Sequence, residues 1–116
     1  MNLYHRTQES VDIVKLPERL MMADAASARA ILKDIIDQGS GKLILNLSAT
    51  SFMDSSGLAV IVSALQAARK RDGDIYLCGM SKTVRALFEL TRLQTVFQIF
   101  DDETVALRAF GCSMST

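Results

Sequence analysis

Short apolar segments rich in Leu, Ile and Val alternate along this chain with longer segments of helical periodicity. A strand of a parallel sheet is buried on both faces and reads as an apolar run, whereas a helix packed on the sheet repeats its apolar residues at i, i+3, i+4 and i+7. The alternation of the two patterns predicts strand–helix–strand units. The predicted strands are residues 3–8, 11–16, 42–47, 75–78 and 96–100. The predicted helices are residues 25–38, 55–71, 82–91 and 103–110, with Asp24, Ser81 and Asp102 as N-caps of the first, third and fourth.

These elements predict an α/β fold with a mixed, mainly parallel sheet of four or five strands and four helices. The first two strands form an antiparallel hairpin that turns at Glu9 and Ser10. A chain of 116 residues with one Pro fits a single domain over residues 1–116, in which we expect residues 111–116 to be a flexible tail. The expected core includes Leu45, Leu58, Val62, Leu65, Ile75, Leu77, Leu87 and Phe88.

The charge balance argues against several classes of partner. Thirteen basic residues match 13 acidic ones, so a neutral chain offers no strong electrostatic attraction to nucleic acid or to an anionic membrane. No apolar run approaches the roughly 20 residues of a membrane-spanning helix, and the first residues lack the apolar core of a signal peptide. We therefore expect a cytoplasmic protein.

The residues available for chemistry argue against an enzyme. The chain has one His, His5, and two Cys, Cys78 and Cys112, at spacings that do not match a zinc site. We expect His5 to be a solvated side chain near a strand and Cys78 to be inert core. There is no glycine-rich phosphate-binding loop, so we expect no metal and no cofactor.

Residues 51–57, reading SFMDSSG, connect a predicted strand to a predicted helix. Sites in parallel sheets lie beyond the carboxyl ends of strands, which places this connection where a site would be. Asp54, Ser55 and Ser56 crowd a helix N-terminus, and capping alone accounts for such residues. The alternative is functional: a helix N-terminus accommodates an anion, so a serine there could carry a phosphate.

The string FMDSSGL at residues 52–58 resembles the anti-sigma-factor antagonists, which are single STAS domains of bacterial partner-switching systems. The resemblance extends over nearly the whole chain, including the strand, loop and helix at residues 43–62 and the helix at residues 84–90. It implies a STAS fold. In this family the serine directly after the aspartate is the phosphoacceptor, which corresponds to Ser55 here, with Ser56 as the rival.

The resemblance implies a role in signal transduction and transcription regulation. The unphosphorylated protein would bind an anti-sigma factor that is also a GHKL-type serine kinase, and so release that factor's target. Phosphorylation of Ser55 would end the binding, and a PP2C-type phosphatase would restore it. The alternative is a constitutive interaction subunit of a lipid-transport or stressosome assembly. Either role would suit a binding module that is a monomer or a weak dimer.

We expect the contact surface around the phosphorylation loop, in which Asp54, Ser56 and Gly57 form the loop and helix cap. Met21 and Met22 supply an adaptable apolar surface, and Met21 stands where the family commonly has an acidic residue. Small residues of the following helix form an exposed shoulder that lets a partner helix approach, although Val60 there could equally pack on a neighbouring helix. The predicted partner-binding residues are Met21, Met22, Met53, Ala59, Val60, Ser63 and Ala67.

Overall fold

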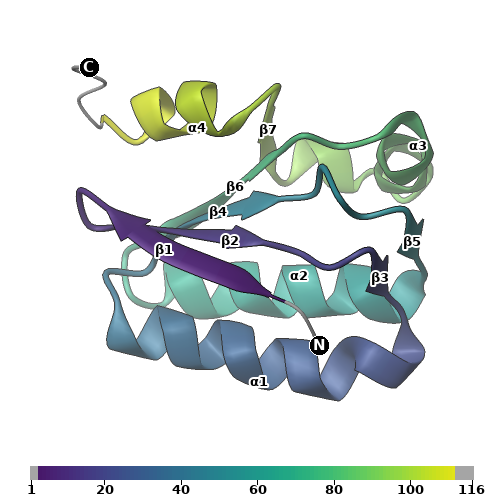
Figure 1. The fold of residues 1–116 in the computed structure, drawn as a ribbon, viewed down its shortest axis with the longest axis horizontal. Coiled ribbons are helices and arrows are strands. Elements are labelled where there is room, and N and C mark those ends of the chain that lie inside the picture. The colour runs from purple at the N-terminus through teal and green to yellow at the C-terminus, as the bar shows by residue number, and fades with distance from the viewer. Residues whose placement is uncertain (1–2, 112–116) are drawn as a thin grey trace.

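A five-stranded sheet forms the centre of the computed structural model, which describes residues 3–111 (Figure 1). The strand order is β1-β2-β4-β6-β7; β1 is antiparallel to β2 and every other neighbouring pair is parallel. This confirms the predicted mixed, mainly parallel sheet. The strands are β1 (Tyr4–Gln8), β2 (Val11–Lys15), β4 (Lys42–Asn46), β6 (Asp74–Cys78) and β7 (Gln98–Phe100).

Within residues 3–111, four α-helices surround this sheet. The long helices α1 and α2 lie together on one face, α4 lies on the opposite face, and α3 lies beyond the ends of β4 and β6 (Figure 1). A 3-10 turn, η1 (Leu93–Thr95), follows α3. The helices are α1 (Met22–Gln38), α2 (Ser55–Arg69), α3 (Lys82–Leu90) and α4 (Glu103–Ala109). None of the helices within that span is long and apolar enough to cross a membrane.

The hairpin of β1 and β2 turns where the sequence predicts it. Glu9 and Ser10 both have positive φ, of 49° and 70°, as the tight turns of two-residue hairpins require. The right-handed twist of such turns matches that of the strands, so β1 pairs with β2 along its whole length, from Tyr4 opposite Lys15 to Gln8 opposite Val11. The predicted antiparallel hairpin is therefore confirmed.

The apolar core has two parts because the central strands are buried on both faces. The larger part lies under α1, α2 and α3, and the smaller part lies under α4. Most predicted core residues are buried, namely Leu45, Leu58, Leu65, Ile75, Leu77 and Phe88. The other two predicted core residues, Val62 and Leu87, are only partly buried and pack against the edge of the larger part.

The bounds of several elements differ from the predicted ones. The first helix begins at Met22, and Asp24 is not its N-cap: Asp24 lies in the first turn, where its Oδ2 accepts the Met21 N–H at 3.1 Å. The second helix ends at Arg69, and η1 delays β7 until Gln98. The expected flexible tail falls mostly on residues 112–116, which lie outside the described residues.

A second, two-stranded sheet was not predicted. It joins β3 (Arg19–Leu20) to β5 (Phe52–Met53) in parallel. Strands of two residues are too short to show alternation of apolar and polar residues, so no sequence pattern predicts them.

Leu65 provides a test of the core. Its side chain is 2% exposed on α2. Leu65→Ala is expected to lower the free energy of unfolding by about 2–5 kcal/mol through lost burial and the cavity left behind. Chemical denaturation measures the change. Gln66→Ala, at the exposed neighbouring position, is expected to change stability by less than about 0.5 kcal/mol, and equal effects of the two substitutions would contradict the packing of α2.

Candidate functional site

The small sheet brings the beginnings of α1 and α2 together. Arg19 lies opposite Phe52 and Leu20 opposite Met53, and both strands run within one residue into a helix. The Glu18 carbonyl accepts hydrogen bonds from the N–H groups of Ser51 and Phe52, at 2.9 and 3.0 Å. Two segments more than 30 residues apart are thus fixed side by side at the carboxyl ends of β2 and β4.

The Asp54 carboxylate connects these two helices. Its Oδ1 accepts the Gly57 N–H at 3.1 Å and so caps α2, as the sequence predicts. Its Oδ2 accepts the N–H of Met22, the first residue of α1, at 3.0 Å. Asp54 therefore satisfies one free donor at each of two helix N-termini.

These hydrogen bonds favour the ionised carboxylate. The bond from the Gly57 N–H lowers the pKa of Asp54 below its ordinary value; desolvation acts in the opposite direction, and the bond from Met22 adds to the lowering. Asp54 is consequently an anion at neutral pH, placed directly before Ser55.

Gly57 is required by a close approach of α2 to the end of β3. A Cβ atom at this position would lie 2.2 Å from the Leu20 carbonyl oxygen and 2.9 Å from Met53 Cγ. Both distances are shorter than side-chain carbons show in proteins, so only a glycine lets α2 begin here. The predicted role of Gly57 in the loop thereby acquires a structural reason that its sequence position does not reveal.

The two candidate phosphoacceptors differ in exposure. Ser55 is exposed as the first residue of α2, whereas the following residue, Ser56, is half-buried. The N-terminus of α2 presents backbone N–H groups and the positive end of the helix dipole to this region. The geometry is thus compatible with an anionic group on Ser55 that reaches solvent.

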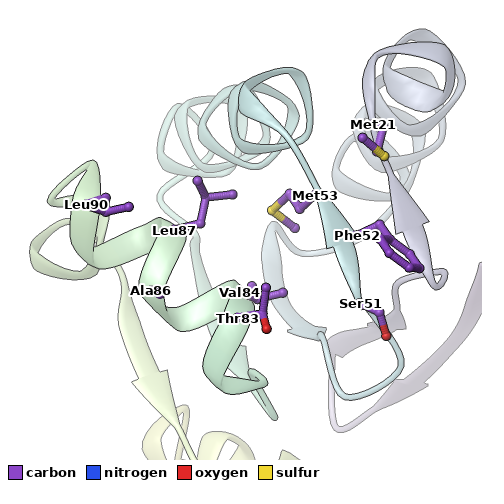
Figure 2. A pocket seen from close by; sticks show the side chains of 9 residues that line it. All are labelled: Met21, Ser51, Phe52, Met53, Thr83, Val84, Ala86, Leu87 and Leu90. Carbon is purple, nitrogen blue, oxygen red and sulfur yellow. The ribbon is translucent and has the colours of Figure 1, made fainter.

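An apolar groove separates the small sheet from α3 (Figure 2). Met21, Phe52 and Met53 lie on one side, and Thr83, Leu87 and Leu90 of α3 lie on the other. Phe52 and Leu90 are 52% and 83% exposed, and the neighbouring Met22 is 74% exposed. Exposed apolar side chains gathered in this way are typical of a protein contact surface. Met21 and Met53, which the sequence predicts as partner-binding residues, line this groove, whereas the contribution of α3 was missed.

The predicted shoulder on α2 is only partly exposed. Ala59 is exposed, but Val60 is fully buried, so the expectation that Val60 is accessible to a partner is wrong. Val60, Ser63 and Ala67 face α1, where they line a narrow groove with Arg29 and Lys33. The small residues let α1 approach α2 closely, and this is the helix contact that the sequence left as the alternative for Val60.

The remaining candidates for chemistry lie away from this loop. His5 Nε2 is 2.8 Å from Oδ1 of Asp12, a buried carboxylate that also accepts the Thr7 hydroxyl. Cys78 is buried in β6, and burial raises the pKa of its thiol to about 12. Among residues 3–111, no three His, Cys, Asp or Glu side chains gather as ligands for a metal ion.

Gly57→Ala tests the close approach of α2 to the Leu20 carbonyl. The added methyl group would strike the Leu20 carbonyl, which belongs to the backbone and cannot rotate away. We expect a loss of about 1–3 kcal/mol in the free energy of unfolding, the usual cost of overpacking, together with shifted amide resonances for Leu20, Met21 and Met22. Ala59→Ser, at an exposed position of the same helix, serves as the control. Unchanged stability and resonances in Gly57→Ala would contradict the described contact.

The lowered pKa of Asp54 predicts a dependence of stability on pH. Because the folded state favours the carboxylate, its contribution is fully present well above the ordinary pKa of 3.8 and is lost as the pH falls below that value. The difference in the free energy of unfolding between the wild type and Asp54→Asn should therefore be larger at pH 7 than at pH 3. Denaturation at the two pH values measures it, and a difference independent of pH would contradict the role of the charge.

Comparisons with known proteins agree with this architecture. The STAS domain family model matches residues 3–106. The anti-sigma-B factor antagonist of Staphylococcus aureus is 28% identical over 99 residues, which cover 85% of this chain and 92% of that protein.

Solved structures show the same fold. The anti-sigma factor antagonist SpoIIAA in its unphosphorylated form superposes with a TM-score of 0.81 at 24% identity, over 97% of this chain and 99% of that one. An anti-sigma-factor antagonist domain protein of Planctomyces limnophilus superposes with a TM-score of 0.86 at 16% identity, over 95% and 98% of the two chains. With its five-stranded mixed sheet, the four helices found within residues 3–111 and a family match over most of its length, the chain belongs to the STAS domain family.

Proposed function

We propose that this protein is an anti-sigma-factor antagonist that works as a phosphorylation-controlled binding module. In its unphosphorylated form it binds an anti-sigma factor that is also a GHKL-type serine kinase, and that factor's target is released. The kinase then phosphorylates Ser55, binding ends, and a PP2C-type phosphatase restores the first state. The similarity to the Staphylococcus aureus antagonist supports the general role.

One observation carries the proposal: an exposed serine, Ser55, opens a 15-residue helix beside an apolar groove. The groove and its exposed neighbours provide apolar area for a protein partner, while the serine provides one position where a large charge can be added. The half-buried Ser56 is less accessible to a kinase, which favours Ser55 as the acceptor.

The transfer of a phosphoryl group would change the site without unfolding it. The Ser55 oxygen bonds to the γ-phosphorus of ATP, the bond from that phosphorus to ADP breaks, and the serine proton passes to a base of the kinase. The product carries about −1.5 to −2 charges and three acceptor oxygens. Because the N-terminus of α2 stabilises an anion, the fold accommodates the phosphate.

The partner cannot accommodate the phosphate as easily. A hydroxyl buried at an interface becomes a dianion, and a charge buried without a matching group costs several kcal/mol. Since each 1.4 kcal/mol corresponds to about tenfold in affinity, a loss of about 100-fold or more is the expected order of magnitude. Phosphorylation would therefore release the partner through electrostatics and desolvation.

The proposed contact surface consists of Met21, Met22, Phe52, Met53 and Ala59, around the exposed Ser55. A stable partner buries about 800 Å² per side, which is about an eighth of the 6352 Å² of this protein's accessible surface. A patch of that size covers the phosphorylation loop and reaches the groove beside α3. The buried Val60 is no longer part of it, and Ser63 and Ala67 contribute only at its edge.

The phosphoacceptor is tested by incubation with ATP and candidate GHKL-type kinases. The wild type is expected to gain the mass of one phosphate, and peptide mapping should place it on Ser55. Ser55→Ala should bind the kinase and take up no phosphate, whereas Ser56→Ala, the matched control, should still be modified. Phosphate on Ser56, or uptake by Ser55→Ala, would contradict the assignment. Binding that is unaffected by phosphate would favour a constitutive interaction subunit instead.

The contact surface is tested by adding bulk beside Ser55. Ala59→Arg is expected to weaken partner binding at least about tenfold without lowering stability, because Ala59 is exposed and small. Ser63→Arg is a poorer probe, since Ser63 faces Arg29 and Lys33 of α1 and a third cation there would also disturb helix packing. Calorimetric titration and thermal unfolding measure both effects. Unchanged affinity in Ala59→Arg would move the interface elsewhere.

A further inference from the structure

The two oxygens of Asp54 hold segments that play different parts in the proposed interface. Oδ1 accepts the Gly57 N–H inside the helix that begins with Ser55. Oδ2 accepts the Met22 N–H, and the side chain of Met22 is 74% exposed on the contact surface. A single carboxylate thus links the phosphoacceptor helix to the apolar segment formed by Met21 and Met22, which we name the methionine segment.

A phosphate on Ser55 would compete with this carboxylate. Backbone N–H groups near the start of α2, Gly57 among them, are the donors nearest to a phosphate on its first residue. The phosphate would therefore seek the hydrogen bond that Asp54 now accepts from Gly57, and its charge would repel the adjacent Asp54 anion. Both effects would weaken the hydrogen bonds that hold the Asp54 side chain in place.

In α1, the Met22 N–H is the group whose hydrogen bonding depends directly on Asp54. It belongs to the first turn of α1, where no helix carbonyl is available to accept it. The preceding Met21 N–H is held instead by Asp24, a residue of the same helix. Loss of the Asp54 contact would leave α1 folded while it frees the methionine segment to shift.

We infer that Asp54 transmits the phosphorylation state of Ser55 to the methionine segment, so that a phosphate both adds charge at the interface and displaces part of its apolar surface. The inference rests on the proposed phosphorylation of Ser55. Asp54 is here a positioning residue, because it acts on the partner through Met22. The parallel pairing of Leu20 with Met53 stays in place and limits the movement to the residues that follow it.

The experiment measures backbone amides of the intact protein with and without phosphoserine at position 55. Phosphoserine is incorporated during translation, so that the result does not depend on a kinase. In the phosphorylated form, hydrogen exchange of the Met22 amide is expected to be about tenfold faster or more, with a shifted resonance. The internal control is the Val105 amide of α4, which donates a hydrogen bond of 3.0 Å to the N-cap residue Asp102. Its exchange should not change.

A substitution separates the two contacts of Asp54. Asp54→Ser retains an N-cap for α2 but has a side chain too short to hold Met22 as well. Met22 exchange should be fast in this variant, Gly57 should remain protected, and phosphoserine should cause no further acceleration at Met22. Asp102→Ser, the matched control at the N-cap of α4, should keep the full phosphate-dependent change at Met22.

The outcomes distinguish this inference from the proposed function. Equal Met22 exchange in the two forms of the wild type would overturn the inference, as would a phosphate effect at Met22 that persists in Asp54→Ser. If Asp54→Ser does not fold, Asp54→Asn replaces it in the same comparison. Failure of candidate kinases to modify the protein, or of partners to bind it, would overturn the proposed function and leave the exchange measurement intact.

Discussion

The approach of α2 to the Leu20 carbonyl is the contact on which the whole loop depends. Because Gly57 has no side chain, the first turn of α2 reaches the end of β3, and the two-residue strands can pair. That pairing in turn places Met22 within hydrogen-bond distance of Asp54. The absence of a Cβ atom at Gly57 thus permits the two-stranded sheet, and this sheet allows Asp54 to cap both helices.

Much of the fold follows from patterns that are local in sequence. Local sequence patterns predicted a mixed sheet of four or five strands, four helices and the hairpin turn at Glu9 and Ser10, because each depends on neighbouring residues. The start of α1 was placed too late, since Met22 is held by Asp54, 32 residues away. Val60 was placed on the surface although it is buried, because periodicity does not show which second helix covers a face. Local patterns are blind to contacts of this kind.

The candidate site was predicted in part for the same reason. The string around Ser55 located the helix N-terminus and its cap, and these are features of adjacent residues. The α3 side of the groove was missed, because it depends on where α3, which follows β6, lies relative to the small sheet. Its exposed Leu90 is the signal that could have indicated it: a large apolar residue on the outer face of a short amphipathic helix has few structural reasons to be there.

Under the proposed function, the position of the serine explains how a small domain could bind a partner and still release it. In that proposal the exposed apolar side chains around the loop would supply most of the attraction to the partner, and such attraction varies little with salt. A phosphate at the edge of this apolar surface would then have a large effect, because the adjacent Asp54 is itself an anion and offers it no compensating charge. At the centre of the groove the same group would lose the backbone donors of α2 and would disturb the free protein as well. At the first residue of α2 it would leave the fold intact, disturb the free protein only at the methionine segment and cost the complex far more, which is the asymmetry that a reversible switch requires.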